Sequence, residues 1–309
     1  MPSRLPKTDI SVIIPTYQRP LQLAGALRAL ARQRYPNDEF EVIVVNDGGA
    51  ESLKSVLQPF ERDLQLRLLC QPNAGPGAGR NTGAAQARGA LIAFLDDDCE
   101  PAPDWLRTLK SAAEAAPGCL LGGRTIAGFP EVSCLVASQM IQGIVYDFYN
   151  AQPASARFFA SNNMAVPADL FRSLCGFDGE FRIAAEDRDF CERWRLAGRR
   201  MLYVPGAVVN HCNRLTLTGF LRQHFRYGRG AAQFHRKRSR RASSPLRSHV
   251  AMYLPWHKWL LRPWREASGS LAARLQLLLL LWQVANTAGF VYGLIFDVGR
   301  NVRSANKEQ

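Results

Sequence analysis

Short apolar runs rich in β-branched residues alternate with amphipathic segments along the first third of this 309-residue chain. Apolar runs bounded by turn-forming residues are typical of strands, and apolar positions three or four residues apart are typical of helices. Alternation of the two predicts a mainly parallel sheet with helices on both faces. The predicted strands cover residues 10–15, 41–45, 66–70 and 91–95, and the predicted helices cover residues 21–33, 50–62, 80–88 and 105–116.

The pattern becomes irregular from residue 117 to about residue 160, before a helix that ends near Gly198 and a strand at residues 207–210. Residues 275–296 then form 22 positions without a charge, about the length that crosses the hydrocarbon core of a bilayer. Polar residues interrupt this stretch, so it fits a helix that spans a membrane, lies in its interface or packs on the protein. They are Gln276, Gln283, Asn286 and Thr287.

Positive charge is concentrated in the C-terminal third of the chain, whose net charge is +13. Residues 193–265 contain seventeen Lys or Arg and no Asp or Glu, whereas the remainder carries 22 basic and 26 acidic side chains. This asymmetry predicts a mildly acidic domain and a basic region that binds an anionic partner, either nucleic acid or anionic lipid.

The seven cysteines are scattered and form no Cys-x-x-Cys pair, so the sequence indicates neither a disulfide framework nor a zinc site. A reducing, cytoplasmic environment fits this pattern. No apolar segment precedes the first predicted strand, so no secretory signal peptide is expected.

Three carboxylates, Asp96, Asp97 and Asp98, directly follow the apolar run at residues 91–95. Ligands of open α/β sheets bind outside the carboxyl ends of the strands, and carboxylate oxygens are preferred ligands of Mg²⁺ and Mn²⁺. The triplet therefore indicates a metal-nucleotide site. A solvated acidic turn is the alternative, because Asp is common where a strand ends.

Two other strand ends carry side chains that suit a nucleotide. Arg19 can bind phosphate, Tyr17 can stack on a base, and Asp47 can accept a hydrogen bond from a base or a ribose. Each of them alone also fits an ordinary turn. The glycine-rich residues 73–81 could be a dinucleotide loop, but they follow the third strand rather than the first.

Several short motifs occur in order between residues 9 and 215. They are Ile13–Arg19, Val44–Gly48, Asn73, Gly79–Asn81, Phe94–Asp98, Ser161–Ala165, Gly176–Asp178, Ala185–Phe190 and Trp194–Gly198. Together they resemble the family 2 glycosyltransferases, with Gly49 where that family usually has serine. The resemblance implies an α/β fold of the GT-A type, that of nucleotide-diphospho-sugar transferases. We expect an N-terminal tail at residues 1–8, a catalytic domain at 9–215 and a basic, partly apolar helical extension at 216–309.

The resemblance also implies roles for individual residues in binding a nucleotide-sugar donor. Those expected at the donor site are Pro15, Thr16, Tyr17, Arg19, Asp47, Arg80, Asn81, Asp96 and Asp97. Within this set Asp47 would bind the base, Asp96 would reach the ribose or diphosphate, and Arg80 and Asn81 would contact phosphates at a helix N-terminus.

A metal ion, Mn²⁺ or Mg²⁺, is the cofactor that the resemblance implies. Asp98 would be the principal ligand of the Asp-x-Asp motif, and His211 would complete the site. A histidine ligand favours Mn²⁺, because Mg²⁺ strongly prefers oxygen. A lone histidine with a purely structural role is the alternative.

Asp187 is the residue that the resemblance implies as general base, in a reaction that inverts the sugar's configuration. The alternative is structural, because acidic residues are favourable near a helix N-terminus. The expected acceptor pocket comprises Asn162, Asn163, Glu186 and Trp194.

The basic C-terminal third points to a membrane more than to nucleic acid. Residues 220–230 interleave aromatic and basic residues, residues 236–241 are polybasic, and residues 255–264 mix Trp with basic residues as a membrane-interface anchor does. RNA binding would suit the first of these but not the apolar residues 275–296. With basic residues before that stretch, the catalytic domain is expected on the cytoplasmic face of the membrane.

The sequence therefore predicts an inverting, metal-dependent transferase that moves a sugar from a nucleotide-diphosphate sugar, by default a UDP-sugar. The expected acceptor is a lipid-linked or envelope glycan at the membrane. The alternative is a non-catalytic protein of the same fold that binds a nucleotide-sugar or a nucleic acid.

Overall fold

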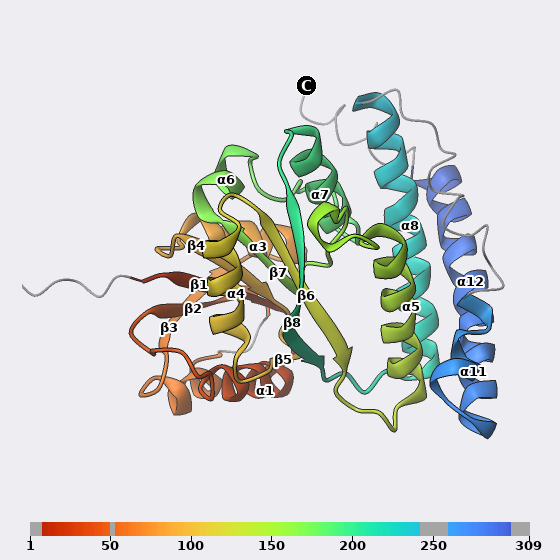
Figure 1. The fold of residues 1–309 in the computed structure, drawn as a ribbon, viewed down its shortest axis with the longest axis horizontal. Coiled ribbons are helices and arrows are strands. Elements are labelled where there is room, and N and C mark those ends of the chain that lie inside the picture. The colour runs from red at the N-terminus through yellow and green to blue at the C-terminus, as the bar shows by residue number, and fades with distance from the viewer. Residues whose placement is uncertain (1–7, 50–52, 242–258, 298–309) are drawn as a thin grey trace, which may run out of the picture. The chain divides into compact units, whose positions relative to one another are not determined.

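The structure is a computed structural model that describes residues 8–49, 53–241 and 259–297 (Figure 1). It contains two compact units. Among the described residues, the first comprises those of 8–128, 149–182 and 186–213, and the second comprises those of 129–148, 183–185 and 214–297. The second unit thus includes two segments from within the range expected for the catalytic domain, whose limits stay a prediction. Most of the expected N-terminal tail and residues 255–258 lie outside the described residues.

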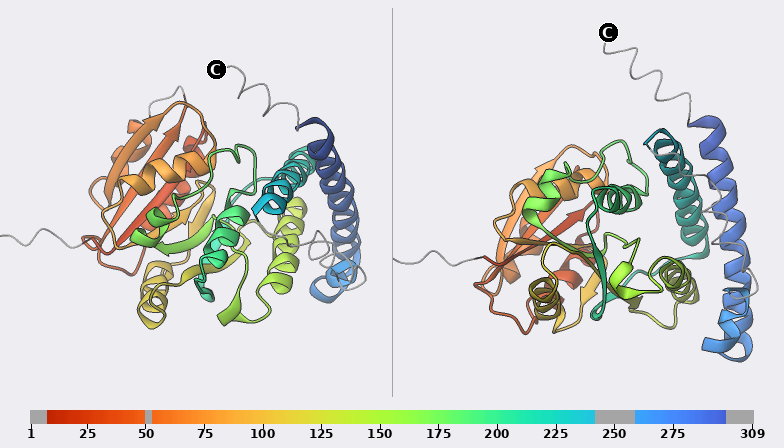
Figure 2. Two further views of the ribbon diagram at one scale, coloured as in Figure 1. Left: turned by 90° about the horizontal axis from the view of Figure 1, so that it is seen from above. Right: turned by 45° about the horizontal axis from the view of Figure 1, so that its top comes forward.

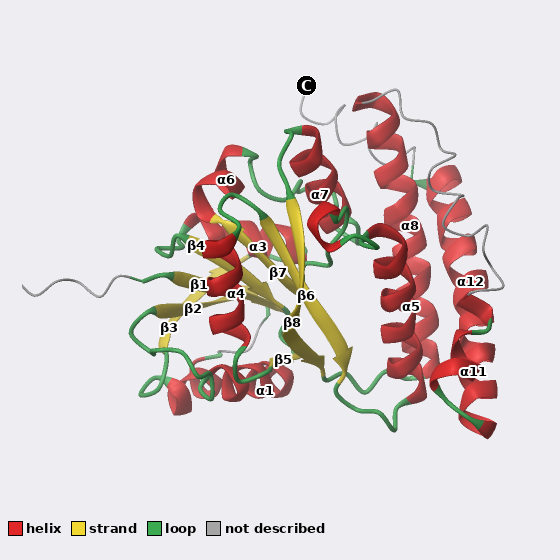
Figure 3. Cartoon of the chain, in the orientation of Figure 1, coloured by secondary structure: helices red, strands yellow, loops and turns green. Residues whose placement is uncertain are grey.

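The first unit is built on an eight-stranded sheet with the order β3-β2-β1-β4-β7-β6-β8-β5, drawn in yellow in Figure 3. The strands are β1 (Ile10–Thr16), β2 (Phe40–Asp47), β3 (Gln65–Gln71), β4 (Leu91–Leu95), β5 (Cys99–Pro101), β6 (Leu120–Ala127), β7 (Asn163–Pro167) and β8 (Met201–His211). Strands β1 to β4 pair in parallel, as predicted. Strand β7 is antiparallel to both β4 and β6, and β5 is antiparallel to β8.

Helices cover both faces of the sheet and make the unit a three-layer α/β structure (Figure 1). Helices α1 (Pro20–Leu30) and α4 (Trp105–Ala115) share one core with the side chains of Ile10, Val12 and Ile14. Helix α3 (Pro76–Ala85) approaches the opposite face, where a Cβ atom on Gly83 would lie 2.5 Å from the Ile13 side chain. On that same face, α6 (Ala168–Ser173) packs the ring of Phe171 against Phe94, and α7 (Glu186–Leu196) packs the ring of Phe190 against Phe171.

A bulge in β8 interrupts its parallel pairing with β6. Gly123 pairs with Val204, but the next residue, Arg124, pairs with Val208. The side chain of Asn163 compensates by donating to the carbonyl oxygens of Arg124, at 3.1 Å, and Ala207, at 2.9 Å. Buried main-chain oxygens that lose a ladder partner need such a substitute.

Some predicted elements differ from the observed ones. The helix predicted at 50–62 is shorter in the described residues, which form α2 (Lys54–Leu57) and one 3₁₀ turn (Gln58–Phe60), because Pro59 has no N–H to donate and restricts the residue before it. Helix α3 begins at Pro76 rather than near residue 80, since proline suits the first turn.

The prediction of an irregular region at residues 117–160 was wrong. These residues contain β6 and the 17-residue helix α5 (Ser133–Tyr149). A short 3₁₀ turn (Pro153–Ser155) follows α5. Two adjacent glycines in β6, Gly122 and Gly123, resemble a turn signal and conceal the strand in the sequence.

The second unit contains most of α5 together with α8 (Leu217–Arg241), α11 (Arg262–Glu266) and α12 (Gly269–Phe296). Helices α8 and α12 lie side by side in both views of Figure 2. Their backbones touch without intervening side chains: a Cβ atom on Gly289 would lie 2.0 Å from the carbonyl oxygen of Phe225. By length and composition α12 could cross a membrane, and a third of its most apolar window is buried in the structure.

Candidate active site

Four of the predicted site residues lie at one edge of the sheet. Strands β1, β2, β4 and β8 all point the same way, because β7 is antiparallel to β4 and β6, and β6 is parallel to β8. Their C-terminal ends carry Thr16, Asp47, Asp96 and His211 respectively. This is the edge at which ligands of α/β sheets bind.

A candidate metal centre lies where β5 begins and β8 ends. One ligand atom each from Asp98, Cys99 and His211 lies within 4.8 Å of the others, and Asp98 Oδ1 is 3.3 Å from His211 Nε2. Asn213 donates to the other oxygen of Asp98 at 3.2 Å. Burial alone would raise the pKa of Asp98, but its bond to His211 and the charges of His211 and Arg19 lower it, so Asp98 is ionised.

The donor atoms suit a hard or intermediate cation. A carboxylate oxygen and an imidazole nitrogen are acceptable ligands of Mn²⁺. Burial, with the charge of Asp98, raises the pKa of the Cys99 thiol well above its ordinary value, so the thiol keeps its proton. Mn²⁺ prefers oxygen and nitrogen ligands to sulfur, so Asp98 and His211 suit this ion better than Cys99 does.

Arg19 lies against two of the three carboxylates. Its Nη1 atom is 3.3 Å from Asp97 and 3.1 Å from Asp98. Thr16 also donates to Asp97 at 2.7 Å. Burial and the neighbouring charge of Asp98 nevertheless raise the pKa of Asp97 to about 6. Asp97 is therefore a buried support for the site, whereas Asp96 is a third exposed.

Arg80 connects the carboxylate triplet to the Glu186–Asp187 pair. The side chain is buried and binds Asp96 through Nη2 and Glu186 through Nη1, the latter at 2.9 Å. A buried guanidinium is stable only with such partners. Both carboxylate groups thus border one site, although Asp96 and Glu186 are far apart in the sequence.

Glu186 and Asp187 lie in the first turn of α7. Burial, with the charge of Asp187, raises the pKa of Glu186 to about 7, and Arg80 opposes this rise. Burial also raises the pKa of Asp187, while the main-chain N–H of Arg188, which donates to it at 2.7 Å, acts in the opposite sense. Asp187 is thus a stronger base than an exposed carboxylate.

Asp47 organises the loop before α3. It accepts hydrogen bonds from the main-chain N–H groups of Ala74 and Gly75, both at 2.9 Å, and from Gln71 at 2.7 Å. Gln71 and Ala74 share Oδ1, so Oδ2 retains a lone pair that could accept one more donor. The glycine-rich loop therefore wraps around Asp47.

Three predicted site residues have structural positions instead. Asn163 and Trp194 are fully buried, and Trp194 Nε1 donates to the carbonyl oxygen of Arg200 at 2.8 Å. The amide of Asn81 exchanges two hydrogen bonds with the main chain of Phe177. Contrary to expectation, their polar groups are directed at the protein rather than at an open pocket.

The remaining predicted residues differ in exposure. Tyr17 is 45% exposed, as a ring that stacks on a base requires, and Pro15 is buried in β1. Asn162 donates weakly to Cys99 at 3.7 Å, and within the described residues its buried Oδ1 has no hydrogen-bond partner. Asn162 is the expected pocket residue that keeps a polar atom available.

Sequence reasoning missed Asn213 and Gln71, which orient Asp98 and Asp47. Asn213 follows His211 by two positions, so its closeness to the metal centre could have been inferred from the strand that carries the histidine. No comparable signal marks Gln71 apart from its place at the end of β3.

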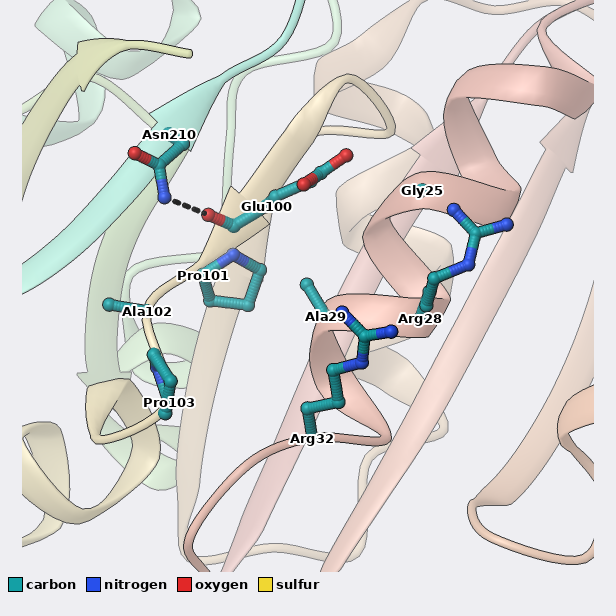
Figure 4. Close-up of a pocket in the computed structure, with 9 residues that line it drawn as sticks. All are labelled: Gly25, Arg28, Ala29, Arg32, Glu100, Pro101, Ala102, Pro103 and Asn210. Carbon is teal, nitrogen blue, oxygen red and sulfur yellow. Dashed lines mark hydrogen bonds between the residues drawn. The ribbon is translucent and has the colours of Figure 1, made fainter.

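A cavity of about 230 Å³ lies between α1 and the β5–β8 pair (Figure 4). Arg28 and Arg32 line one side, and Glu100 and Asn210 line the other. None of the residues assigned to the donor, metal or base sites lines this cavity.

An α/β sheet that presents carboxylates, a histidine and arginines at its C-terminal edge is the arrangement of a nucleotide-dependent transferase. Comparisons with known proteins agree. Residues 11–168 match the model of glycosyl transferase family 2, and residues 91–295 match that of glycosyl transferase family group 2. The chain belongs to glycosyl transferase family 2 and is a glycosyltransferase of the GT-A fold.

Relatives include the glycosyltransferase AglE of Haloferax volcanii, 30% identical over 241 residues that cover 75% of each chain. The glucosyl-dolichyl phosphate glucuronosyltransferase of the same organism is 25% identical over 65% of this chain and 68% of its own length. Among solved structures, the mannosyltransferase PcManGT of Pyrobaculum calidifontis, in complex with GDP-Man and Mn²⁺, superposes with a TM-score of 0.65 at 21% identity, covering 95% of this chain and 88% of that one. This last likeness concerns the fold.

Proposed function

We propose that the protein is an inverting, metal-dependent glycosyltransferase that moves a sugar from a nucleotide-diphosphate sugar to an acceptor hydroxyl. The observation that carries the proposal is the position of Arg80 between Asp96 and Glu186. Arg80 thus links the carboxylate triplet, assigned to the donor and the metal ion, with the Glu186–Asp187 pair, which includes the base. A direct displacement requires donor and acceptor to meet at one site.

Asp187 takes the proton of the acceptor hydroxyl. Its raised pKa makes it a stronger base than an exposed carboxylate, and the N–H of Arg188 fixes one of its oxygens. The deprotonated hydroxyl attacks the anomeric carbon from the face opposite the leaving group, so the configuration inverts. Arg80 keeps the neighbouring Glu186 in place through its 2.9 Å contact.

On the donor side, Tyr17 stacks on the base and Asp47 accepts a hydrogen bond from it. Asp96, the more exposed carboxylate of the triplet, faces the ribose or diphosphate. The UDP-sugar remains our default donor, but the Pyrobaculum relative holds GDP-Man, so the base is a matter for measurement.

Asp98 and His211 would hold the metal ion, and Arg19 lies beside them. When bound, the ion supplies positive charge that neutralises the departing diphosphate. The imidazole favours Mn²⁺ over Mg²⁺, in agreement with the Mn²⁺ in the Pyrobaculum relative.

A lipid-linked or envelope glycan at the cytoplasmic membrane face is the proposed acceptor. The basic C-terminal third supports this, and the name of one Haloferax relative includes a dolichyl phosphate. The test compares transfer to two acceptors that carry the same sugar in detergent. One acceptor is linked to a polyprenyl phosphate, and the other is a free glycoside. Equal rates on the two acceptors would contradict a lipid-linked substrate.

The substitution Asp187→Asn tests the reaction itself. Transfer should fall by about 10²- to 10⁴-fold, the contribution of a general base, while the rise in melting temperature with nucleoside diphosphate and Mn²⁺ persists. Glu192→Gln, on the same helix, is the matched control and should retain transfer. Normal transfer by Asp187→Asn would disprove the base assignment, and a wild type stabilised by no nucleoside diphosphate would disprove the donor class.

A further inference from the structure

Helix α12 carries a row of exposed apolar side chains on one side. Leu277 is 57% exposed, Val284 68% and Ile295 61%. We define the α12 face as Leu277, Leu280, Val284, Val291, Leu294 and Ile295. Their spacing of mostly three, four or seven residues places them on one side of the helix. Soluble proteins rarely expose an apolar row of this length without a partner.

The opposite side of α12 packs on α8 along most of its length. Trp282 contacts His224 near one end, and the Nη1 atom of Arg236 donates to the carbonyl oxygen of Gly293, at 2.6 Å, near the other. Arg229 and Asp297 form an ion pair at 2.7 Å. The helices are therefore parallel and tied together at both ends.

Charge is restricted to α8 and to the ends of the pair. Arg222 and Arg226 are exposed on α8, and the last turn of α8 carries Arg238, Arg240 and Arg241. Residues 214–241 and 259–297 together contain twelve basic and two acidic side chains. Helix α8 buries its own apolar face, and α12 is apolar on its exposed side, so the pair presents an apolar side from α12 and a basic side from α8.

We propose that the α8–α12 pair docks on an anionic lipid bilayer, with the α12 face inserted at the boundary of headgroups and acyl chains and α12 lying in the membrane plane. The 28 residues of α12 are long enough to cross. Crossing would, however, carry Arg222 and Arg226 into hydrocarbon, because α8 packs along the same length. Lying in the plane keeps both arginines in water.

A second copy of the chain is a less favourable occupant of the α12 face. Two such surfaces would bring like charges together, since the same regions hold twelve basic and two acidic side chains. Anionic headgroups attract the basic region instead, with a strength that decreases with the distance of each charge from the surface.

Vesicle flotation of the full-length protein tests the docking. The vesicles contain phosphatidylcholine alone or phosphatidylcholine with phosphatidylglycerol. We expect binding at least about tenfold tighter with the anionic lipid, and a loss of about tenfold in Val284→Glu. Ser270→Glu adds the same charge to an exposed position of α12 outside the apolar stretch and should change binding less than about twofold.

Equal binding by the two variants would overturn the proposal. A wild-type protein that dimerises and does not float, together with a monomeric Val284→Glu variant, would also overturn it. The α12 face would then be occupied by a second copy of the chain. Circular dichroism and the melting temperature establish that both variants are folded.

Membrane topology is the second test. Epitope tags at the two termini are exposed to protease in sealed membrane vesicles of known orientation. A helix that lies in the plane leaves both tags on one side, so both are removed together. Removal of the tags from opposite sides would overturn the planar placement. Neither test uses sugar transfer, so its outcome is independent of the proposed function.

Discussion

The carboxylate site and the α8–α12 pair are held together by opposite means. The site joins charged side chains from distant segments, as when Arg80 binds both Asp96 and Glu186. The pair joins two continuous helices through direct backbone contact, as at Gly289 and Phe225. The structure of the carboxylate site therefore depends on charge balance, and the packing of the α8–α12 pair depends on side-chain size.

The two regions should respond differently to substitution. Removing one buried charge leaves its partners uncompensated even when the shape is unchanged. Adding one carbon atom where two backbones touch forces the helices apart even when no charge changes. Substitutions that alter only charge or only size separate the two cases.

The largest effect is expected from Asp98→Asn, which keeps the shape of the metal centre and removes its negative charge. Transfer should fall at least about a hundredfold, because a metal ion contributes several kcal/mol to stabilising the leaving group. Mn²⁺ should also no longer raise the melting temperature. Titration with Mn²⁺, followed by both activity and thermal unfolding, measures these changes.

Cys99→Ala is the control for this experiment. Its sulfur lies in the same cluster but is a softer ligand than Mn²⁺ prefers, so the Mn²⁺ response should survive the substitution. A lost response in Cys99→Ala, or a retained one in Asp98→Asn, would mean that the ligands are assigned incorrectly.

An intermediate effect is expected from Gly289→Ala, which changes size without charge. The added Cβ would lie 2.0 Å from the carbonyl oxygen of Phe225, and backbone of this kind has little freedom to move. The clash should outweigh the helix propensity gained and lower the free energy of unfolding by about 1–2 kcal/mol. Gly179→Ala, with no atom within 4 Å of its added Cβ, should stay within about 0.5 kcal/mol of wild type in urea unfolding.

The smallest effect is a change in pH dependence in Glu186→Gln. As the pH falls through about 7, the wild-type Glu186–Asp187 pair takes up a proton and activity declines. Removing the charge of Glu186 lets Asp187 stay ionised to lower pH, so the acid limb of kcat/KM should move down by about one pH unit. Profiles are compared at saturating Mn²⁺, so that protonation of His211 does not contribute. An unmoved acid limb would contradict the coupling.

The sequence predicts the first half of the fold well because its strands are apolar on both faces and end in polar residues. Runs such as residues 91–95 are buried throughout, and the carboxylates that follow them mark the edge of the sheet. The grouping of Asp98 with His211 followed from the family resemblance, and the two side chains lie close together in the structure. The role of His211 as a ligand stays a prediction.

Other features could not be inferred from local pattern. Strand β6 contains paired glycines because Gly122 lies against the ring of Phe159, which is a tertiary contact. The partners of Asn81 and Trp194 are main-chain atoms, in the case of Asn81 from a residue distant in sequence. A motif indicates that a residue matters without indicating whether it faces the ligand or the protein.

The amide of Asn163 shows how far from the chemistry a motif residue can act. It closes the gap left by the bulge in β8, and residues beyond that bulge pair so that His211 lies opposite Cys99, beside Asp98. The alignment of one strand end with another thus depends on a side chain that meets neither metal nor sugar. Asn163 thus satisfies the carbonyl oxygens at the bulge, beyond which β8 continues to the candidate metal centre.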